Sequence, residues 1–218
     1  MKITALTTQQ RDPNRLNVLI DGVYRFSLTL TQVVDLGIAV GMELSEETVE
    51  KLEGESTYGK LYQRTLEYCF VRQRSEKEVR DYLYRKTRPT PVKNRTTGQV
   101  SIRPGVSQSV AQRVLDTLTE KGYLDDRKFA EFWVQHRFMR KGISQRKLRV
   151  ELMAKGVDAH IIKEVLQASE RDDSSELQKV VAKKRARYTD DVKFMQYLAR
   201  QGFSYDDIKE ELARGESD

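Results

Sequence analysis

The chain has 218 residues, of which 33% are charged and only 38% belong to the hydrophobic set, and its formal net charge is +6. It holds neither the roughly 18 consecutive apolar residues that a transmembrane helix needs nor the apolar segment of a secretory signal. A single cysteine, Cys69, can form no internal disulfide and no Cys-rich zinc cluster. We therefore expect a soluble, cytoplasmic protein built from several small helical units, because one large globule would be more apolar.

Charge is unevenly distributed along the chain. Residues 1–57 carry 5 basic and 9 acidic side chains, residues 58–203 carry 32 and 18, and residues 204–218 carry 2 and 6. No acidic residue lies between Asp81 and Asp116, or between Glu131 and Glu151. Solvated helices usually mix signs to gain i,i+4 ion pairs. These stretches therefore favour a polyanionic or acidic partner over simple solvation.

Residues 1–57 predict a small mixed region. Stretches rich in Val, Ile, Tyr and Phe flank Asp21-Gly22, a strong two-residue hairpin signal, and Pro13 marks an earlier turn. We expect three short strands within residues 2–28. A short helix stopped by Gly37 and a second helix, capped by Ser45 and ending near residue 54, should follow.

From residue 58 on the pattern is helical and repeats. Three segments align without gaps from Ser75, Ser144 and Asp190, which are all N-cap residue types. Each segment has an apolar residue four positions after the cap and a leucine eight positions after it, which places both on one helix face. The aligned leucines are Leu83, Leu152 and Leu198.

A helix before and a helix after each segment complete three modules of three helices, so the predicted fold class is mainly α with a small β-rich or mixed N-terminal region. The expected limits are 1–57 for that region and 58–122, 123–170 and 171–218 for the modules. The glycines that follow helices are expected to act as left-handed C-cap residues without chemistry of their own. They are Gly122, Gly156 and Gly202.

The first module contains an insertion at about 87–109. Ser144 lies 69 residues after Ser75, whereas Asp190 lies only 46 residues after Ser144. The insertion holds three of the four prolines and part of a long acid-free stretch, and it could form a hairpin through Thr97-Gly98. A segment of this length is either functional or a disordered surface excursion, and the sequence leaves both open.

Signatures of catalysis are missing from the sequence. It has no phosphate-binding GxxxxGK[ST] loop and no HExxH motif, and its two histidines, His136 and His160, lie far apart. The acidic residues cluster at helix starts, where capping and the helix dipole explain them. We therefore predict no enzymatic activity, no metal site and no cofactor.

Four motifs in order resemble the bacterial RecX family of RecA regulators. They are "RSEKEVRDYLYRK", "GYLDDRKFAEFWVQHR", "KGISQRKLRVELMAKGVD" and "YLARQGFSYDDIKEEL", and the similarity spans about residues 60–214. The N-terminal "VLIDGVYRFSL" is similar to the extra region of longer family members, whereas the insertion departs from the common family pattern.

The resemblance implies tandem three-helix modules in an elongated, curved protein. It also implies binding to the filament of RecA on single-stranded DNA, with inhibition of ATP hydrolysis, filament growth, strand exchange and co-protease activity. Direct contact with single-stranded DNA, and with double-stranded DNA as a further option, is part of the same expectation. We see no dimerisation heptads and expect a monomer.

The motif residues divide into a structural set and a contact set. We expect core packing for Leu124, Phe129, Trp133 and Tyr123, and helix-start positions for Asp125 and Asp126. The cations expected to touch the filament form one basic face. They are Arg72, Arg74, Arg85, Lys86, Arg88, Lys93, Arg95, Arg103, Arg137, Arg140, Lys141, Arg146, Lys147, Arg149, Lys183, Lys184, Arg185 and Arg187.

Two other functions remain open from the residues. Three-helix units with short turns are similar to helix-turn-helix modules, so a DNA-binding regulator that acts without RecA is the main alternative. The other possible function is that of an adaptor that binds an acidic protein.

Overall fold

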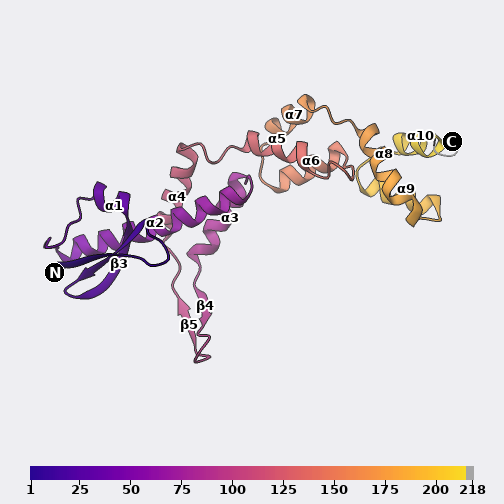
Figure 1. Ribbon diagram of the computed structural model, residues 1–218. Coiled ribbons are helices and arrows are strands. Elements are labelled where there is room, and N and C mark those ends of the chain that lie inside the picture. The colour runs from indigo at the N-terminus through magenta and orange to yellow at the C-terminus, as the bar shows by residue number, and fades with distance from the viewer. Residues whose placement is uncertain (215–218) are drawn as a thin grey trace. The chain divides into compact units, whose positions relative to one another are not determined.

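The computed structural model describes residues 1–214, and helices dominate this part of the chain (Figure 1). The described chain forms two compact units. The first comprises Met1–Arg72 and Val79–Tyr123, and the second comprises Gln73–Glu78 and the described chain from Leu124 onward. The mainly helical fold class with a small N-terminal strand region is confirmed.

A three-stranded antiparallel sheet opens the first unit. Its strands are β1 (Ile3–Thr8), β2 (Arg15–Ile20) and β3 (Val23–Thr29), in the order β1-β2-β3. Asp21 and Gly22 make the predicted turn with φ of 49° and 84°. The sheet, the short helix α1 (Leu30–Asp35) and the start of α2 (Glu46–Val71) enclose an apolar core.

The helix α2 corrects one prediction. Separate helices were expected to end near residue 54 and to begin near residue 58, but α2 is continuous over 26 residues. Contacts with the sheet region stabilise its middle: Ser56 Oγ donates to Ser27 O at 2.6 Å, and Gln32 Nε2 donates to Glu55 O at 2.7 Å. Tertiary contacts of this kind override the weak helix propensity of Gly54.

The rest of the first unit consists of two helices and a hairpin. Helices α3 (Glu76–Thr87) and α4 (Gln108–Glu120) flank the hairpin, and α4 packs on α2. Strands β4 (Thr90–Lys93) and β5 (Val100–Arg103) confirm the predicted hairpin in the insertion, with a turn at Gly98. The ribbon projects away from α2, α3 and α4 (Figure 1).

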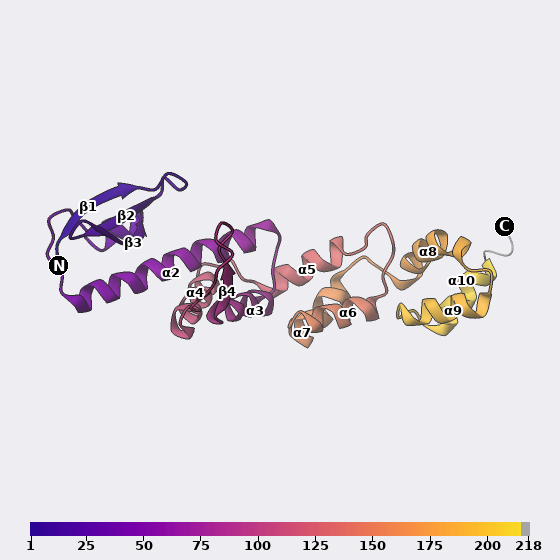
Figure 2. The same ribbon diagram turned by 90° about the horizontal axis from the view of Figure 1, so that it is seen from below.

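From Leu124 onward the second unit contains two groups of three helices, which can be followed in Figure 2. Helices α5 (Asp126–His136), α6 (Gln145–Ala154) and α7 (Ala159–Ala168) share one apolar cluster. Helices α8 (Asp173–Lys184), α9 (Asp191–Arg200) and α10 (Tyr205–Arg214) share another, and the 3-10 turn η1 (Arg185–Arg187) joins α8 to α9. The limits of the three modules stay predictions.

The core predictions are confirmed with one exception. Leu83, Leu152, Leu198, Phe129 and Leu124 are buried, and Trp133 is half-buried. Tyr123 is wrong as a core residue, because it is 42% exposed and its ring makes a T-shaped contact with the exposed ring of Phe70.

Candidate partner-binding surface and the junctions that position it

Most cations of the predicted basic face are exposed in the structure, and they occupy separate elements. The end of α3 carries Arg85, Lys86 and Arg88, and the hairpin carries Lys93, Arg95 and Arg103. The α5–α6 loop carries Arg140 and Lys141, and α6 carries Arg146 and Arg149. The end of α8 carries Lys183, and η1 carries Arg187. Arg72, Arg74 and Lys184 are half-buried.

Three predicted contact cations are instead engaged within the protein. Arg137 donates from Nε and Nη2 to the carboxylate of Glu151 at 2.8 and 3.0 Å, and Lys147 bonds the side chain of Gln201. Arg185 pairs with Asp191 at 2.6 Å. These side chains hold helices together, so they are less available to a partner than the sequence suggested.

Aromatic rings position two cations at the end of α3. The guanidinium of Arg88 lies 4.8 Å from the ring centroid of Tyr84, which is 52% exposed. The ammonium of Lys86 lies 4.8 Å from the ring of Tyr82, whose other partner is the stacked ring of Tyr68. Burial raises the pKa of the Tyr82 phenol above its ordinary value.

The first turn of α3 is fixed by a set of hydrogen bonds that we call the α3 junction, formed by Ser75, Glu76, Asp126 and Lys155. Ser75 caps α3 by accepting from Glu78 N at 3.2 Å and donates from Oγ to Lys155 O at 2.7 Å. Glu76 N donates to Asp126 Oδ1 at 2.8 Å. The cap serine therefore serves two helices at once.

The first turn of α6 repeats this arrangement in the α6 junction, formed by Ser144, Gln145, Asp173 and Gln201. Ser144 caps α6 by accepting from Lys147 N at 3.1 Å and donates from Oγ to Gln201 O at 2.6 Å. Gln145 N donates to Asp173 Oδ1 at 2.7 Å. Burial raises the pKa of Asp173, and the Gln145 hydrogen bond opposes that rise.

Glycines close both junctions. Gly156 and Gly202 have φ of 82° and 96°, which confirms them as left-handed C-cap residues. A Cβ on Gly156 would lie 2.7 Å from Lys77 Cβ, and one on Gly202 would lie 2.5 Å from Ser144 Oγ. Both glycines thus also permit close approach of the neighbouring helix, a role that the sequence analysis did not assign to them.

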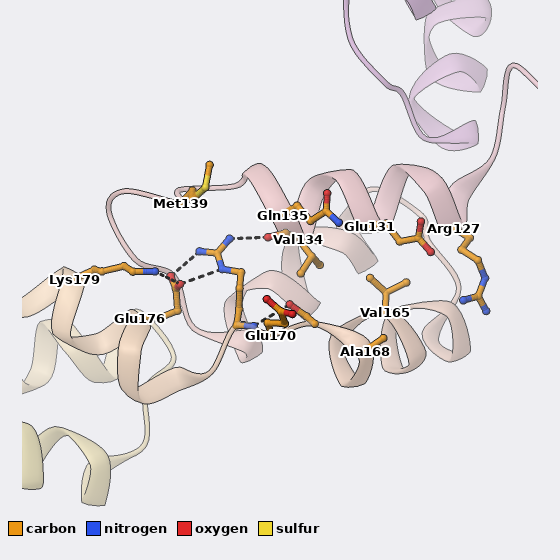
Figure 3. Close-up of a pocket in the computed structure, with 12 residues that line it drawn as sticks. Arg127, Glu131, Val134, Gln135, Met139, Val165, Ala168, Glu170, Glu176 and Lys179 are labelled. Carbon is orange, nitrogen blue, oxygen red and sulfur yellow. Dashed lines mark hydrogen bonds and ion pairs between the residues drawn. The ribbon is translucent and has the colours of Figure 1, made fainter.

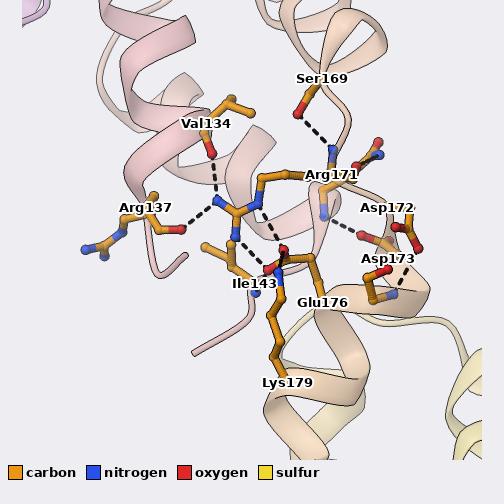
Figure 4. Close-up of polar contacts among 11 residues, drawn as sticks. Val134, Arg137, Ile143, Ser169, Arg171, Asp172, Asp173, Glu176 and Lys179 are labelled. Atoms are coloured by element: carbon orange, nitrogen blue, oxygen red, sulfur yellow. Dashed lines mark hydrogen bonds and ion pairs between the residues drawn. The ribbon is translucent and has the colours of Figure 1, made fainter. Parts of the chain in front are cut away.

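A buried ion pair adjoins the α6 junction (Figure 4). Glu176 is 2% exposed and accepts from Arg171 Nη2 at 2.6 Å, Lys179 Nζ at 2.7 Å and Ile143 N at 2.9 Å. Arg171 Nη1 donates to the carbonyls of Val134 and Arg137. Burial acts to raise the pKa of Glu176, but the hydrogen bonds from Arg171, Lys179 and Ile143 outweigh it, so the pKa lies below its ordinary value.

A groove of about 670 Å³ lies beside this ion pair (Figure 3). Its walls carry three cations, Arg127, Arg171 and Lys179, and three carboxylates, Glu131, Glu170 and Glu176. The buried polar atoms of Arg171 and Glu176 are satisfied by the network described above. The balanced charge gives this groove no preference for an anionic partner.

Within residues 1–214, His, Cys, Asp and Glu form no group of three that could hold a metal ion. No helix in this range is long and apolar enough to cross a membrane.

Comparison with family models gives two matches. Residues 1–45 match the model described as the regulatory protein RecX N-terminal domain, and residues 125–166 match the second three-helix domain of RecX. The latter range covers α5, α6 and most of α7.

Relatives and solved structures extend the similarity over almost the whole chain. A regulatory protein RecX from Bacillus licheniformis is 30% identical over 96% of this chain and 76% of its own length. A regulatory protein RecX from Clostridium botulinum is 27% identical over 96% of this chain and 93% of its own length. A crystal structure of a regulatory protein RecX shares the fold with a TM-score of 0.69 at 20% identity, over 97% of this chain and 98% of that one. Taken with the repeated capped helices, these similarities show that the chain belongs to the RecX family of regulatory proteins.

Proposed function

We propose that the chain binds the filament of RecA on single-stranded DNA and inhibits RecA. The inhibited activities are ATP hydrolysis, filament growth, strand exchange and co-protease action, and direct DNA contact is part of the binding. Membership of the RecX family supports this proposal. The observation that carries it is the group of exposed cations on the α5–α6 loop and α6, namely Arg140, Lys141, Arg146 and Arg149.

These four cations have no acidic ion-pair partner within the described chain. None of them takes part in an ion pair with another residue of the described chain, although Lys141 lies 5.7 Å from the Phe138 ring centroid. Glu151, the acidic residue nearest in sequence to Arg146 and Arg149, is bound to Arg137 and to the Trp133 indole N–H. An unpaired guanidinium is available for bidentate bonds to phosphate or carboxylate.

The junctions explain how these cations keep a fixed arrangement. Hydrogen bonds that Ser144 and Gln145 donate to Gln201 and Asp173 hold the N-terminus of α6, which carries Arg146 and Arg149 in its first two turns. Binding to this surface therefore orders fewer side-chain and backbone degrees of freedom of the chain than binding to a free loop would. In this proposal the chain acts by binding alone, as a monomer in the cytoplasm, without a metal or cofactor.

The alternative of a duplex-reading regulator has less support. In a helix-turn-helix unit the second helix of the turn reads the major groove, and here that helix is α7. Its exposed residues include Asp158, His160 and Lys163, and its Glu164 pairs with Arg127. This surface lacks the concentration of cations found on α6.

Charge reversal on α6 tests the proposal. The double variant R146E/R149E should bind RecA filaments, assembled on single-stranded DNA with a slowly hydrolysed ATP analogue, roughly tenfold more weakly than the wild type. The control K163E/K209E makes the same change of net charge on α7 and α10 and should bind like the wild type. A wild-type chain that does not bind the filament would refute the proposal.

Salt dependence tests the DNA part separately. If about five phosphates are engaged, log affinity for single-stranded DNA should fall with log salt at a slope near −3.5. A slope near zero would remove direct DNA contact while leaving filament binding intact.

A further inference from the structure

We propose that one outward stripe of α6 docks on an apolar protein surface with acidic residues at its edge, and that this surface belongs to the protein part of the filament and not to its DNA. We call it the α6 stripe: Arg146, Arg149, Val150 and Met153. The inference rests on the proposed function and adds the residues and the kind of partner.

Helix geometry places the α6 stripe on one face. Its members are spaced i, i+3, i+4 and i+7, which is the spacing of a single helical face. The opposite face carries Leu148 and Leu152, which are 1% and 0% exposed in the core of the second unit. The stripe is fully outward, because Val150 is 60% exposed and Met153 is 56% exposed, and both arginines are exposed as well.

No polar side-chain contact within the described chain uses this stripe. The side chains of Arg146 and Arg149 make no hydrogen bond or ion pair with another residue of the range 1–214, in contrast to those of Arg137 and Lys147. The only carboxylate of α6, Glu151, is 20% exposed and bound on the side facing Arg137. The stripe therefore presents two free guanidinium groups around two apolar side chains.

This composition fits a protein surface better than a nucleic acid. Proteins that bind single strands stack bases on aromatic rings, and the stripe has none. Valine and methionine gain nothing from phosphate, whereas an apolar protein patch buries them, and the flexible methionine adapts to irregular surfaces. Arginine at the edge of such a patch pairs with acidic side chains, which gives the charge complementarity of an interface.

The combination occurs on α6 and not at the aligned positions of α9. Those positions, 46 residues further on, are Val192, Met195, Gln196 and Ala199, so α9 offers an exposed Val192 but no cation. This makes Val192 a matched control: it has the same exposed apolar character, at 63%, on the equivalent helix.

The test compares V150Q/M153Q with V192Q on two targets, the RecA filament on single-stranded DNA and the bare strand. Glutamine is a good helix former and these positions are exposed, so folding should be kept. We expect V150Q/M153Q to lose about tenfold in filament affinity and to keep its affinity for the bare strand, while V192Q keeps both. R146Q/R149Q should lose filament affinity in a salt-dependent way.

Two results would overturn the stripe proposal while filament binding by the wild type stands. One is wild-type filament affinity in V150Q/M153Q. The other is an equal loss on the filament and on the bare strand, which would make the stripe a nucleic-acid contact. A wild-type chain that binds no filament at all overturns the proposed function, and the stripe proposal with it.

Discussion

The first turns of α3 and α6 are held by the same two hydrogen bonds but by different charges. In each junction a buried serine, Ser75 or Ser144, donates to the carbonyl of the C-cap residue of another helix. An aspartate accepts from the backbone N–H of the residue that follows the serine. At the α3 junction the charged partner is the Lys155–Glu78 pair, whose side chains are 27% and 14% exposed. At the α6 junction the carboxylate of Glu176 is 2% exposed.

This comparison separates the hydrogen bonds that recur in both junctions from the charged side chains that differ between them. The serine and aspartate bonds recur and therefore define how one capped helix meets another. At the α6 junction the Glu176 network also ties down the α5–α6 loop through Ile143 N and Arg137 O. That loop carries cations of the proposed binding surface, so the buried carboxylate of this junction lies next to them.

Removing the buried carboxylate should have the largest effect. Glu176→Ala leaves Arg171 without its charged partner, and breaking a buried pair in this way costs about 3–5 kcal/mol. Glu78→Ala at the α3 junction serves as the comparison and should cost less, because the side chains of its pair with Lys155 are 27% and 14% exposed. Denaturant unfolding of both variants measures the difference, and equal losses would contradict the comparison.

Removing the shared serine should have a smaller effect at both junctions. Ser144→Ala removes a helix cap and leaves Gln201 O without its donor, which should cost about 1–2 kcal/mol. Ser75→Ala should cost a similar amount, because the two hydroxyls make the same bonds. A cost at one site only would mean that the serines are not equivalent. Calorimetric unfolding of the two variants decides this.

Acid should weaken the α6 junction specifically. The pKa of Glu176 is lowered in the folded state, so its stabilisation is present above its ordinary value of 4.5 and is lost as pH falls through the folded-state pKa. Asp173 acts in the opposite direction, because burial raises its pKa. We expect Glu176→Gln to reduce the loss of stability between neutral pH and pH 3, measured by urea unfolding. An unchanged acid profile would exclude Glu176 as its source.

The smallest effect should come from Lys155, the more exposed partner of the ion pair at the α3 junction. Lys155→Gln removes the ion pair with Glu78 but keeps the backbone carbonyl that Ser75 uses, so we expect a loss below about 1 kcal/mol. High salt should reduce this loss further by screening the pair. A loss that is large or independent of salt would show that Lys155 acts through packing on Trp133, whose ring lies 5.0 Å from the ammonium.

Local signals predicted much of the fold. Cap residues, turn glycines and leucine spacing located the repeated helices and both hairpins, because these features depend on neighbours in sequence. The continuity of α2 was missed, since it depends on contacts from Ser27 and Gln32 far along the chain. The exposure of Tyr123 was missed for the same reason.

The candidate surface was predicted less well than the fold. Charge runs identify cations but not their partners, so Arg137 and Lys147 were assigned to the partner although they bind Glu151 and Gln201. The sequence did not distinguish the outward apolar residues Val150 and Met153 from the inward leucines of the same helix, because that distinction depends on which face of α6 packs on the core. Asp126 was assigned only to the start of α5, although its carboxylate accepts from Glu76 N at the α3 junction.

The RecA ATPase on single-stranded DNA tests the central claim most directly. Titrating the wild-type chain into RecA under conditions of steady hydrolysis should lower the rate in a saturable way, and R146E/R149E should need roughly tenfold more protein for the same effect. The control K163E/K209E should inhibit like the wild type. An ATPase rate that stays constant across the titration would contradict the account.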